Sequence, residues 1–410
     1  MGENRNGTSG TAGETAEVNA MIVGIDASNI RGGGGVTHLV ELLRAADRQA
    51  HGFSQVVLWS GQSTLSQIED RSWLVKKHPA SLDKDLLQRV FWQRFQLSRA
   101  ARSAGCDVLF VPGGAFAGDF RPMVTMNQNL FPFEWRELRR YGLSWMTSKM
   151  LLLRWSQSRT FRKADGVIFL TRYAQNVVNK VVRVDPDKST TVPHGIHKRF
   201  AMAPREQVAI ESYTLDRPFR ILYVSVVDKY KHQWHVAKAV AKLRESGLPV
   251  ALDLVGPSHA PSLMRLQETM AAVDPNGKYI RYLGALPYDA VHSRYASADL
   301  SVFASSCESF GQILTEAMSA GLPIACSNRS AMPELLGDAG LYFDPENPDD
   351  IAKALRQLIE SPELRAQKAQ MAFVRAQSYT WQRCANETFG MLMKVAKKNG
   401  NVSDLKHNRS

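Results

Sequence analysis

Two glutamates lie in the segment CESFGQILTEAMSAGLPIACS (Cys307–Ser327), whose residue types can bind a sugar phosphate. Glu308 and Glu316 are eight residues apart, which is a little over two turns of a helix. If the helix starts near Ser309, Glu308 lies at its first turn and Glu316 on a similar side, two turns further on. The alternative is that Glu308 is a helix-start acid and Glu316 a surface acid.

The start of this predicted helix could bind a diphosphate. Backbone N–H groups of a first turn have no partners inside the helix and carry partial positive charge. These are the amides around Gly311, Gln312 and Ile313, and Gly311 would let a ligand approach the backbone closely. Glu308 would then meet hydroxyl groups beside the phosphate, and Glu316 a ribose.

A second segment whose residue types could take part in catalysis or binding is YVSVVDKYKHQWHVAKAV (Tyr223–Val240), where a strand is followed by a helix. Lys229 and Lys231 lie at the turn between these two elements. A lysine at that place can neutralise a diphosphate as a point charge. The alternative for Lys231 is a solvated lysine at a helix start.

Polar residues in the first half are candidates for the other side of the same site. The run Gly32–Gly35 precedes a helix but lacks the GxGxxG spacing of a dinucleotide site. Asp26, which ends the strand before it, is expected to order this loop rather than to catalyse. An amide cluster follows another strand, where such side chains face a cleft, with turn formation as the alternative. The residues that we assign to the acceptor side of the cleft are Gly34, Gly35, Asn127, Gln128, Asn129 and His194, the last being either structural or a ligand contact.

Alternating strands and helices must position these residues. Apolar runs that suit buried parallel strands recur in two parts of the chain, with helical stretches between them. This pattern predicts two parallel, doubly wound α/β sheets with a ligand cleft between the domains. The predicted strands are Met21–Ser28, Gln55–Trp59, Asp107–Val111, Met123–Met126 and Gly166–Leu170 in the first sheet, and Phe219–Ser225, Val250–Val255, Tyr279–Leu283, Leu300–Phe303, Pro323–Cys326 and Gly340–Phe343 in the second.

The domain boundaries follow from these runs and from the Pro- and Gly-containing segment between them. Residues 378–396 are expected to form a C-terminal helix that returns to the first domain. The segments at the two ends are polar and are expected to be disordered. The predicted ranges are a tail over 1–20, a first domain over 21–200, a hinge over 201–216, a second domain over 217–377 and a tail over 397–410.

The composition excludes several classes of protein. Hydrophobic residues make up 44% and charged residues 22% of the chain, as in soluble globular proteins, which excludes a mainly disordered chain. No stretch has the roughly 18 apolar residues of a membrane-spanning helix. The cysteines lie far apart and form no zinc or disulfide pattern, so buried reduced thiols in the cytoplasm are expected. They are Cys106, Cys307, Cys326 and Cys384.

The formal net charge of +12 is concentrated in one half of the chain. Residues 71–199 hold 23 Lys and Arg against 9 Asp and Glu, whereas the remainder holds 28 against 30. An anionic partner is therefore indicated on that half, such as nucleic acid, phosphorylated lipid or a membrane surface, with a solvated basic face as the alternative. Within it, Tyr141–Lys163 mixes aromatic and basic residues like a helix that lies on an anionic bilayer. A core helix with an exposed basic face fits equally well.

The segment ESFGQILTEAMSAGLPIACS and the following MPELLGDAGLYFDPENPDDIAKAL resemble the donor-site region of family four retaining glycosyltransferases. The resemblance extends to YLGALPYDAVHSRYASADLSVFASS, TVPHGI and DASNIRGGGGVTHL, and covers about residues 21–395. It implies the GT-B fold, in which two Rossmann-like domains face each other across a cleft. It also implies that Glu308 contacts the transferred sugar and that Glu316 holds the nucleotide ribose.

The same resemblance extends the list of site residues. The amides of Phe310 and Gly311 would face the sugar hydroxyls and phosphates. The family places an arginine and a lysine after the first strand of the second domain, and Lys231 matches the lysine. The arginine position falls near Ser225 or Val226, neither of which can replace it, so Lys229 is the candidate substitute. The predicted catalytic residues are Glu308 and Lys231, and the predicted donor-binding residues are Glu316, Ser309, Phe310, Gly311, Gln312, Ile313 and Lys229.

These observations predict a hexosyltransferase without cofactor or metal, acting in cell-surface polysaccharide or lipopolysaccharide synthesis. The donor would be a nucleotide-diphosphate sugar, with GDP-mannose favoured because YKHQWHVAKAV resembles mannosyltransferase members of the family, and a UDP-hexose open. The acceptor would be a saccharide or a lipid-linked saccharide at the inner face of the plasma membrane. No nucleic acid partner is expected.

Two alternatives stay open at this point. A sugar-nucleotide epimerase of the same fold would need no acceptor. A nucleic-acid-binding protein would use the basic half, although that half has no zinc finger, RRM-type signature or basic zipper. The nucleic-acid alternative also leaves the two glutamates unexplained.

Overall fold

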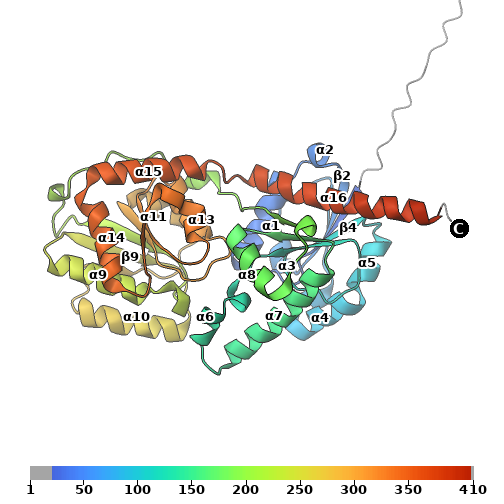
Figure 1. Ribbon diagram of the computed structural model, residues 1–410, viewed down its shortest axis with the longest axis horizontal. Coiled ribbons are helices and arrows are strands. Elements are labelled where there is room, and N and C mark those ends of the chain that lie inside the picture. The colour runs from blue at the N-terminus through green and yellow to red at the C-terminus, as the bar shows by residue number, and fades with distance from the viewer. Residues whose placement is uncertain (1–20, 408–410) are drawn as a thin grey trace, which may run out of the picture.

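The computed structural model describes residues 21–407, and these form two α/β domains that lie end to end (Figure 1). The first domain is built on a seven-stranded sheet with the order β3-β2-β1-β4-β5-β6-β7, whose neighbouring strands are all parallel. The strand order reverses between β1 and β4, where parallel sheets open a crevice at their carboxyl ends. The strands are β1 (Met21–Asp26), β2 (Phe53–Trp59), β3 (Leu74–Lys77), β4 (Val108–Val111), β5 (Met123–Asn127), β6 (Gly166–Phe169) and β7 (Ser189–Thr191).

The second domain repeats this architecture on a six-stranded parallel sheet with the order β10-β9-β8-β11-β12-β13. Its strand order reverses between β8 and β11. The prediction of two doubly wound α/β domains is thus confirmed. The strands are β8 (Phe219–Val224), β9 (Val250–Val255), β10 (Ile280–Tyr282), β11 (Leu300–Phe303), β12 (Ile324–Ser327) and β13 (Leu341–Phe343).

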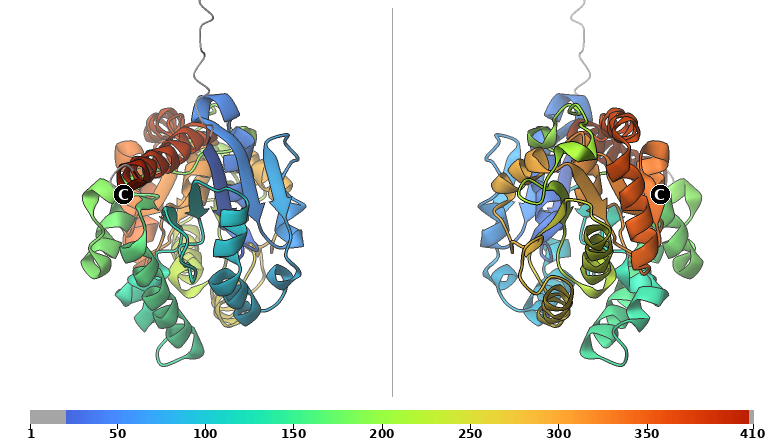
Figure 2. Two further views of the ribbon diagram at one scale, coloured as in Figure 1. Left: turned by 90° about the vertical axis from the view of Figure 1, so that its right-hand side faces the viewer. Right: turned by 90° about the vertical axis from the view of Figure 1, so that its left-hand side faces the viewer.

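Helices cover both faces of each sheet (Figure 2). In β2, Val56 and Leu58 belong to one buried cluster, whereas Val57 and Trp59 belong to another on the opposite face, because successive side chains of a strand point to opposite sides. The helices of the first domain are α1 (Gly33–Ala45), α2 (Arg48–His51), α3 (Gln62–Leu65), α4 (Leu86–Phe95), α5 (Leu97–Ser103), α6 (Trp135–Arg139), α7 (Trp145–Lys163) and α8 (Arg172–Val182). Those that follow are α9 (Gln233–Glu245), α10 (Ala260–Val273), α11 (Tyr288–Ser297), α12 (Gln312–Ser319), α13 (Met332–Leu336), α14 (Pro348–Glu360), α15 (Pro362–Ala376) and α16 (Trp381–His407).

Several local predictions need correction. Strands β3 and β7 were not predicted, because both are only partly buried and so neither has the apolar run of a central strand. The helical segment between β3 and β4 is not continuous but is broken at Gln96 into α4 and α5. The helix expected to start near Ser309 starts at Gln312, after Gly311 in the left-handed conformation.

The chain returns to the first domain through α16, which packs on α1, α2 and the strands β4 to β6 (Figure 1). Its residues Cys384, Phe389 and Leu392 are fully buried. The prediction that 397–410 is unstructured is wrong for 397–407, which continue α16, since extending an anchored helix adds one hydrogen bond per residue. The tail predicted over 1–20 and residues 408–410 lie outside the described residues. All four cysteines are buried free thiols, as expected.

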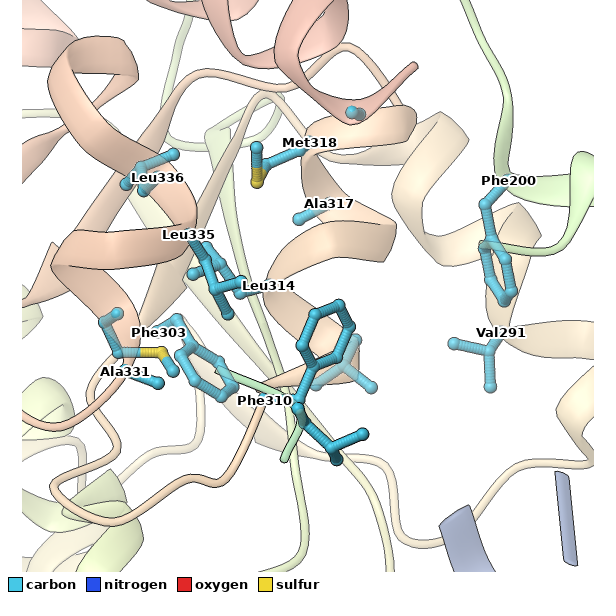
Figure 3. Close-up of a cluster of buried hydrophobic side chains, with 14 of the residues drawn as sticks. Phe200, Val291, Phe303, Phe310, Leu314, Ala317, Met318, Ala331, Leu335 and Leu336 are labelled. Carbon is cyan, nitrogen blue, oxygen red and sulfur yellow. The ribbon is translucent and has the colours of Figure 1, made fainter. Parts of the chain in front are cut away.

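A buried cluster supports the loop that carries the two glutamates (Figure 3). Leu314 and Met318 of α12 pack with Leu335 of α13 and with Phe303, the last residue of β11. Each of these side chains is at most 2% exposed. This packing fixes where β11 ends and where α12 begins. It therefore holds the intervening segment 304–311 at the carboxyl end of the second sheet.

Candidate functional site

A cleft of about 930 Å³ lies between the two domains at the carboxyl ends of both sheets. The first domain contributes Gly32–Gly35, the amides Gln128 and Asn129, and His194. The second contributes Lys231, the segment Glu308–Ile313 and Glu316. The structure thus brings most of the sequence-predicted residues to one cleft, although they come from distant parts of the chain.

Glu308 lies in the loop between β11 and α12 and is held there by its backbone. Its N–H donates to Ser330 Oγ (2.8 Å), and the Ser330 hydroxyl donates back to the Glu308 carbonyl (2.9 Å). The Glu308 carboxylate accepts a hydrogen bond from Lys231 Nζ and forms an ion pair with it. The two side chains are 17% and 8% exposed, so each charge compensates the other at a place poorly reached by water.

Lys231 is positioned by a short 3-10 turn, Lys229–Lys231, after β8. Tyr223 of β8 donates from its hydroxyl to the Lys231 carbonyl (2.6 Å). The Lys231 ammonium also lies 5.5 Å from the ring centroid of Phe303, an arrangement that favours a cation. A cation held beside the start of α12 can stabilise negative charge on a phosphate.

Glu316 lies one turn inside α12 and is 1% exposed, yet it lines the cleft. Its carboxylate is 3.5 Å from the hydroxyl of Tyr295, which is also 3.3 Å from the carbonyl of Ile313. Gly311, directly before α12, has φ +81°, and a Cβ there would come within 2.7 Å of Met332. The chain therefore needs glycine at this position to turn into the helix with its first amides at the cleft.

Two of the predicted donor-binding side chains contact the opposite domain. Ser309 Oγ donates to the Gln128 carbonyl (2.7 Å), and Gln312 Nε2 donates to the Gly195 carbonyl (3.0 Å). Thr171 of the first domain donates in turn to the Ser309 carbonyl (2.9 Å). These contacts hold the loop before α12 against the first domain, so the two walls of the cleft are tied together beside Glu308.

The structure does not bring two of the predicted residues to the cleft. Lys229 points away from it: its Nζ donates to the Arg140 carbonyl (3.1 Å) and lies over the Tyr141 ring. Asn127 is fully buried and donates to the Asn129 carbonyl (3.2 Å) without lining the cleft. Asp26, expected to order the glycine loop, accepts from the Ser28 N–H and from Gln93 Nε2, and burial raises the pKa of its carboxyl.

Sequence reasoning missed several residues that line the cleft. His38 stacks on His194 with ring centroids 4.7 Å apart, and Trp381 of α16 lies against both rings. Burial lowers the pKa of His194 to about 4 and that of His38 well below its usual range, so both rings are neutral near pH 7. Arg31, in the glycine loop, is a cation at the cleft besides Lys231. Only its place beside Gly32–Gly35 could have indicated it.

Two further observations concern metals and membranes. Among the residues whose side chains the structure describes (21–287 and 290–399), no group of three or more His, Cys, Asp or Glu side chains is arranged to hold a metal ion. Within the same part of the chain, none of the helices has the length and apolar character needed to span a membrane.

Family models match both domains. The model described as Glycosyltransferase Family 4 matches residues 32–200, and the one described as Glycosyl transferases group 1 matches residues 207–374. The two matches meet at the predicted hinge and together include nearly all of the cleft residues.

Individual proteins that resemble the chain are also described as glycosyltransferases or mannosyltransferases. An O-antigen chain mannosyltransferase B of Escherichia coli is 36% identical over 27% of this chain and 29% of its own length. A GDP-mannose-dependent alpha-(1-6)-phosphatidylinositol dimannoside mannosyltransferase of Mycobacterium tuberculosis is 28% identical over 61% of this chain and 63% of its own. The chain thus matches less than two thirds of the length of either curated relative. The solved structure of WaaG, a glycosyltransferase involved in lipopolysaccharide biosynthesis, has a TM-score of 0.66 at 17% identity over 91% of this chain and 99% of that one, which shows a shared fold.

Proposed function

Because the chain belongs to the group 1 and family 4 glycosyltransferases and has the GT-B fold, we propose that it is a retaining hexosyltransferase. The donor is a nucleotide-diphosphate sugar, with GDP-mannose favoured over a UDP-hexose. The acceptor is a saccharide or a lipid-linked saccharide in the synthesis of a cell-surface polysaccharide. One observation carries this proposal: Glu308, Lys231, Glu316 and the start of α12 converge on one interdomain cleft.

Each group has a role in the proposed reaction. The diphosphate binds at the start of α12, where unpaired amides and Lys231 neutralise its charge. Glu316 accepts hydrogen bonds from the ribose, and Glu308 orients the hydroxyls of the transferred sugar. In this proposal the diphosphate competes with Glu308 for Lys231, so substrate binding redistributes an ion pair that already exists.

The chemical step breaks the bond between the anomeric carbon and the β-phosphate oxygen and forms a bond from that carbon to an acceptor oxygen. The acceptor proton passes to the departing phosphate on the same face of the sugar, which retains the configuration. His194 and His38 do not serve as cationic acids near pH 7, since burial lowers the pKa of both rings. Lys231 stabilises the charge that develops on the leaving diphosphate.

We also propose that the acceptor reaches the cleft from an anionic membrane at the cytoplasmic face. The outer faces of α4 and α7 support this proposal, because they expose apolar side chains: Leu87 is 79%, Phe91 58% and Phe95 62% exposed, and Trp145 83% and Trp155 61%. The first three are spaced four residues apart and so share one face of α4. Soluble proteins rarely expose such a group without a partner.

Basic residues surround these apolar side chains, as an anionic bilayer requires. Arg94 lies over the Phe95 ring, Arg159 over the Trp155 ring, and Lys149 is exposed on the same helix as Trp155. The loop at Phe116 and Ala117 links the two helices, because the Phe116 N–H donates to Thr160 of α7 (2.9 Å) and the Ala117 N–H donates to Gln93 of α4 (2.9 Å). We call this surface, made by the exposed residues of α4 and α7, the apolar-basic face.

The proposal is tested by a binding and product assay on the purified chain. Specific binding of a donor stabilises the folded state, so GDP-mannose should raise the melting temperature more than UDP- or ADP-sugars do. Incubation of GDP-mannose with and without a saccharide acceptor then separates the reactions. Transfer that needs the acceptor supports the proposal, whereas isomerisation of the donor alone would assign an epimerase.

A further inference from the structure

A second cavity, of about 440 Å³, lies on the other side of the Lys229–Lys231 turn from the cleft. Lys231 points into the cleft, whereas Lys229 lines the second cavity. Its size falls within the range of about 300–1,000 Å³ that small-molecule sites occupy. The first domain contributes Arg140 at the end of α6, and the second contributes Arg265 of α10 and Glu346. The cavity therefore spans the interface between the two domains.

The charges that line this cavity do not cancel. Glu346 is already satisfied by Arg140, which donates two hydrogen bonds to it (2.7 and 2.9 Å), and by Arg136 (2.6 Å). These bonds lower the pKa of Glu346 to about 2, so it stays ionised. Among the described residues, neither Lys229 nor Arg265 has a carboxylate within 4.0 Å. Two cations therefore face the cavity without a counter-charge.

The unused donors of these two cations can reach a ligand. Lys229 donates one of its three ammonium N–H groups to the Arg140 carbonyl, which leaves two for a ligand. Arg265 stacks on the Trp234 ring at 4.1 Å, which holds the guanidinium plane in place while no hydrogen bond to a described residue uses its five N–H groups. An ammonium and a guanidinium held on one cavity are a combination that recognises phosphate oxygens.

The wall of the cavity also contains two buried polar side chains. His232 and Trp234 are 1% and 2% exposed, and both line the cavity. Within the described part of the chain, His232 Nδ1 and Trp234 Nε1 have no hydrogen-bond partner. Both atoms are buried within the wall and are not exposed to the cavity, so they shape the wall, and Lys229 and Arg265 are the groups that can reach a ligand.

We propose that the second cavity is a binding site for a phosphoryl group, of the kind carried by a sugar phosphate, distinct from the donor site. Lys229 and Arg265 hold the phosphate oxygens, and the side chains of His235 and Glu346 border the part of the ligand that lies outside the phosphate. A ligand bound there bridges Arg140 of the first domain to the second domain. Binding in this cavity does not depend on the identity of the donor or on the proposed transfer reaction.

The test is calorimetric titration of the full chain with inorganic phosphate, a hexose 6-phosphate and the neutral hexose. Both phosphates should bind and the neutral hexose should not. Lys229→Met/Arg265→Met should weaken phosphate binding at least about tenfold. The matched control, Lys242→Met/Arg356→Met, removes an exposed cation from α9 and a half-buried one from α14, neither of which lines the cavity, and should bind phosphate like the wild type.

A second pair of substitutions separates this cavity from the cleft. Lys231→Met/Glu308→Gln removes the ion pair of the cleft as a unit and should leave phosphate binding intact. Loss of phosphate binding in that variant would assign the phosphate to the cleft and overturn the proposal, as would equal affinity in all variants or no binding by the wild type. If the variant Lys229→Met/Arg265→Met does not fold, Arg265→Met alone, on an exposed side chain, replaces it with the same expected direction.

Discussion

Lys231 and Glu308, 77 residues apart in the sequence, form an ion pair in the cleft between the domains. The lysine comes from the turn after β8 and the glutamate from the loop after β11, the two neighbouring strands where the order of the second sheet reverses. Neither residue therefore acts alone. A substitution of either changes the charge that the other presents to a substrate.

Substitution Glu308→Gln is expected to lower kcat by about 10²–10³-fold. It should also lower the melting temperature, because Lys231, only 8% exposed on its side chain, loses its counter-charge. The double variant Lys231→Met/Glu308→Gln should melt at a higher temperature than the single variant while staying inactive. A single variant with wild-type turnover would contradict the catalytic role of Glu308.

Substitution Glu316→Gln should act on binding rather than on turnover. A hydrogen bond to a charged group contributes about 1.5–3 kcal/mol, so the Kd for the nucleotide should rise about 10- to 100-fold, with kcat at saturating donor changed much less. Titration calorimetry with the nucleoside diphosphate measures this effect. Glu360→Gln, at an exposed position of α14, serves as the control and should bind normally; equal affinity in both variants would remove Glu316 from the site.

The stability of the fold should fall on mild acidification because of His194. Its pKa is lowered by burial to about 4, from 6.5 in the unfolded chain. Between these two pH values the unfolded state binds a proton that the folded state does not. The contribution of neutral His194 to the free energy of unfolding is therefore fully present above pH 6.5 and is lost as the pH falls towards 4. The loss between pH 7 and pH 5 should be on the order of 1–2 kcal/mol.

Substitution His194→Phe should make this pH dependence shallower, since it removes the titrating ring and keeps an aromatic ring between His38 and Phe310. Urea unfolding at pH 7 and pH 5 measures the difference. His38, whose pKa is lowered as well, should retain part of the slope. If the free energy of unfolding of the variant falls between pH 7 and pH 5 as much as that of the wild type, His194 is protonated in the folded protein at pH 5.

The apolar-basic face should bind vesicles that contain anionic lipid. Phe91→Ser/Trp155→Ser should lower the bound fraction in a sedimentation assay several-fold, and added salt should weaken binding of the wild type. Leu215→Ser, which removes a 64% exposed leucine outside α4 and α7, is the control. Wild-type self-association that the same double substitution abolishes, without vesicle binding, would instead assign the face to a second copy of the chain.

The sequence predicted the central strands well and the edge strands poorly. Runs such as Phe219–Val224 are buried on both faces and are therefore mostly apolar. Such runs can be recognised as strands from the sequence alone. Strand β7, Ser189–Thr191, is only partly buried, so its residues carry no such signal. The sequence alone predicts a start of α12 three residues too early, because the left-handed conformation of Gly311, which directly precedes the helix, has no signal in the apolar pattern.

The sequence alone determined which residue types were present for the chemistry: two glutamates at a helical spacing, a lysine after a strand and a glycine loop. Only the tertiary structure decided which of them meet. Lys229 and Lys231 are two residues apart, yet the short turn directs them into different cavities, and His38, His194 and Trp381 form one cluster from three distant segments. The physical reason is that local pattern specifies strands and helices, whereas the direction of a side chain at a turn depends on the packing of both domains around it.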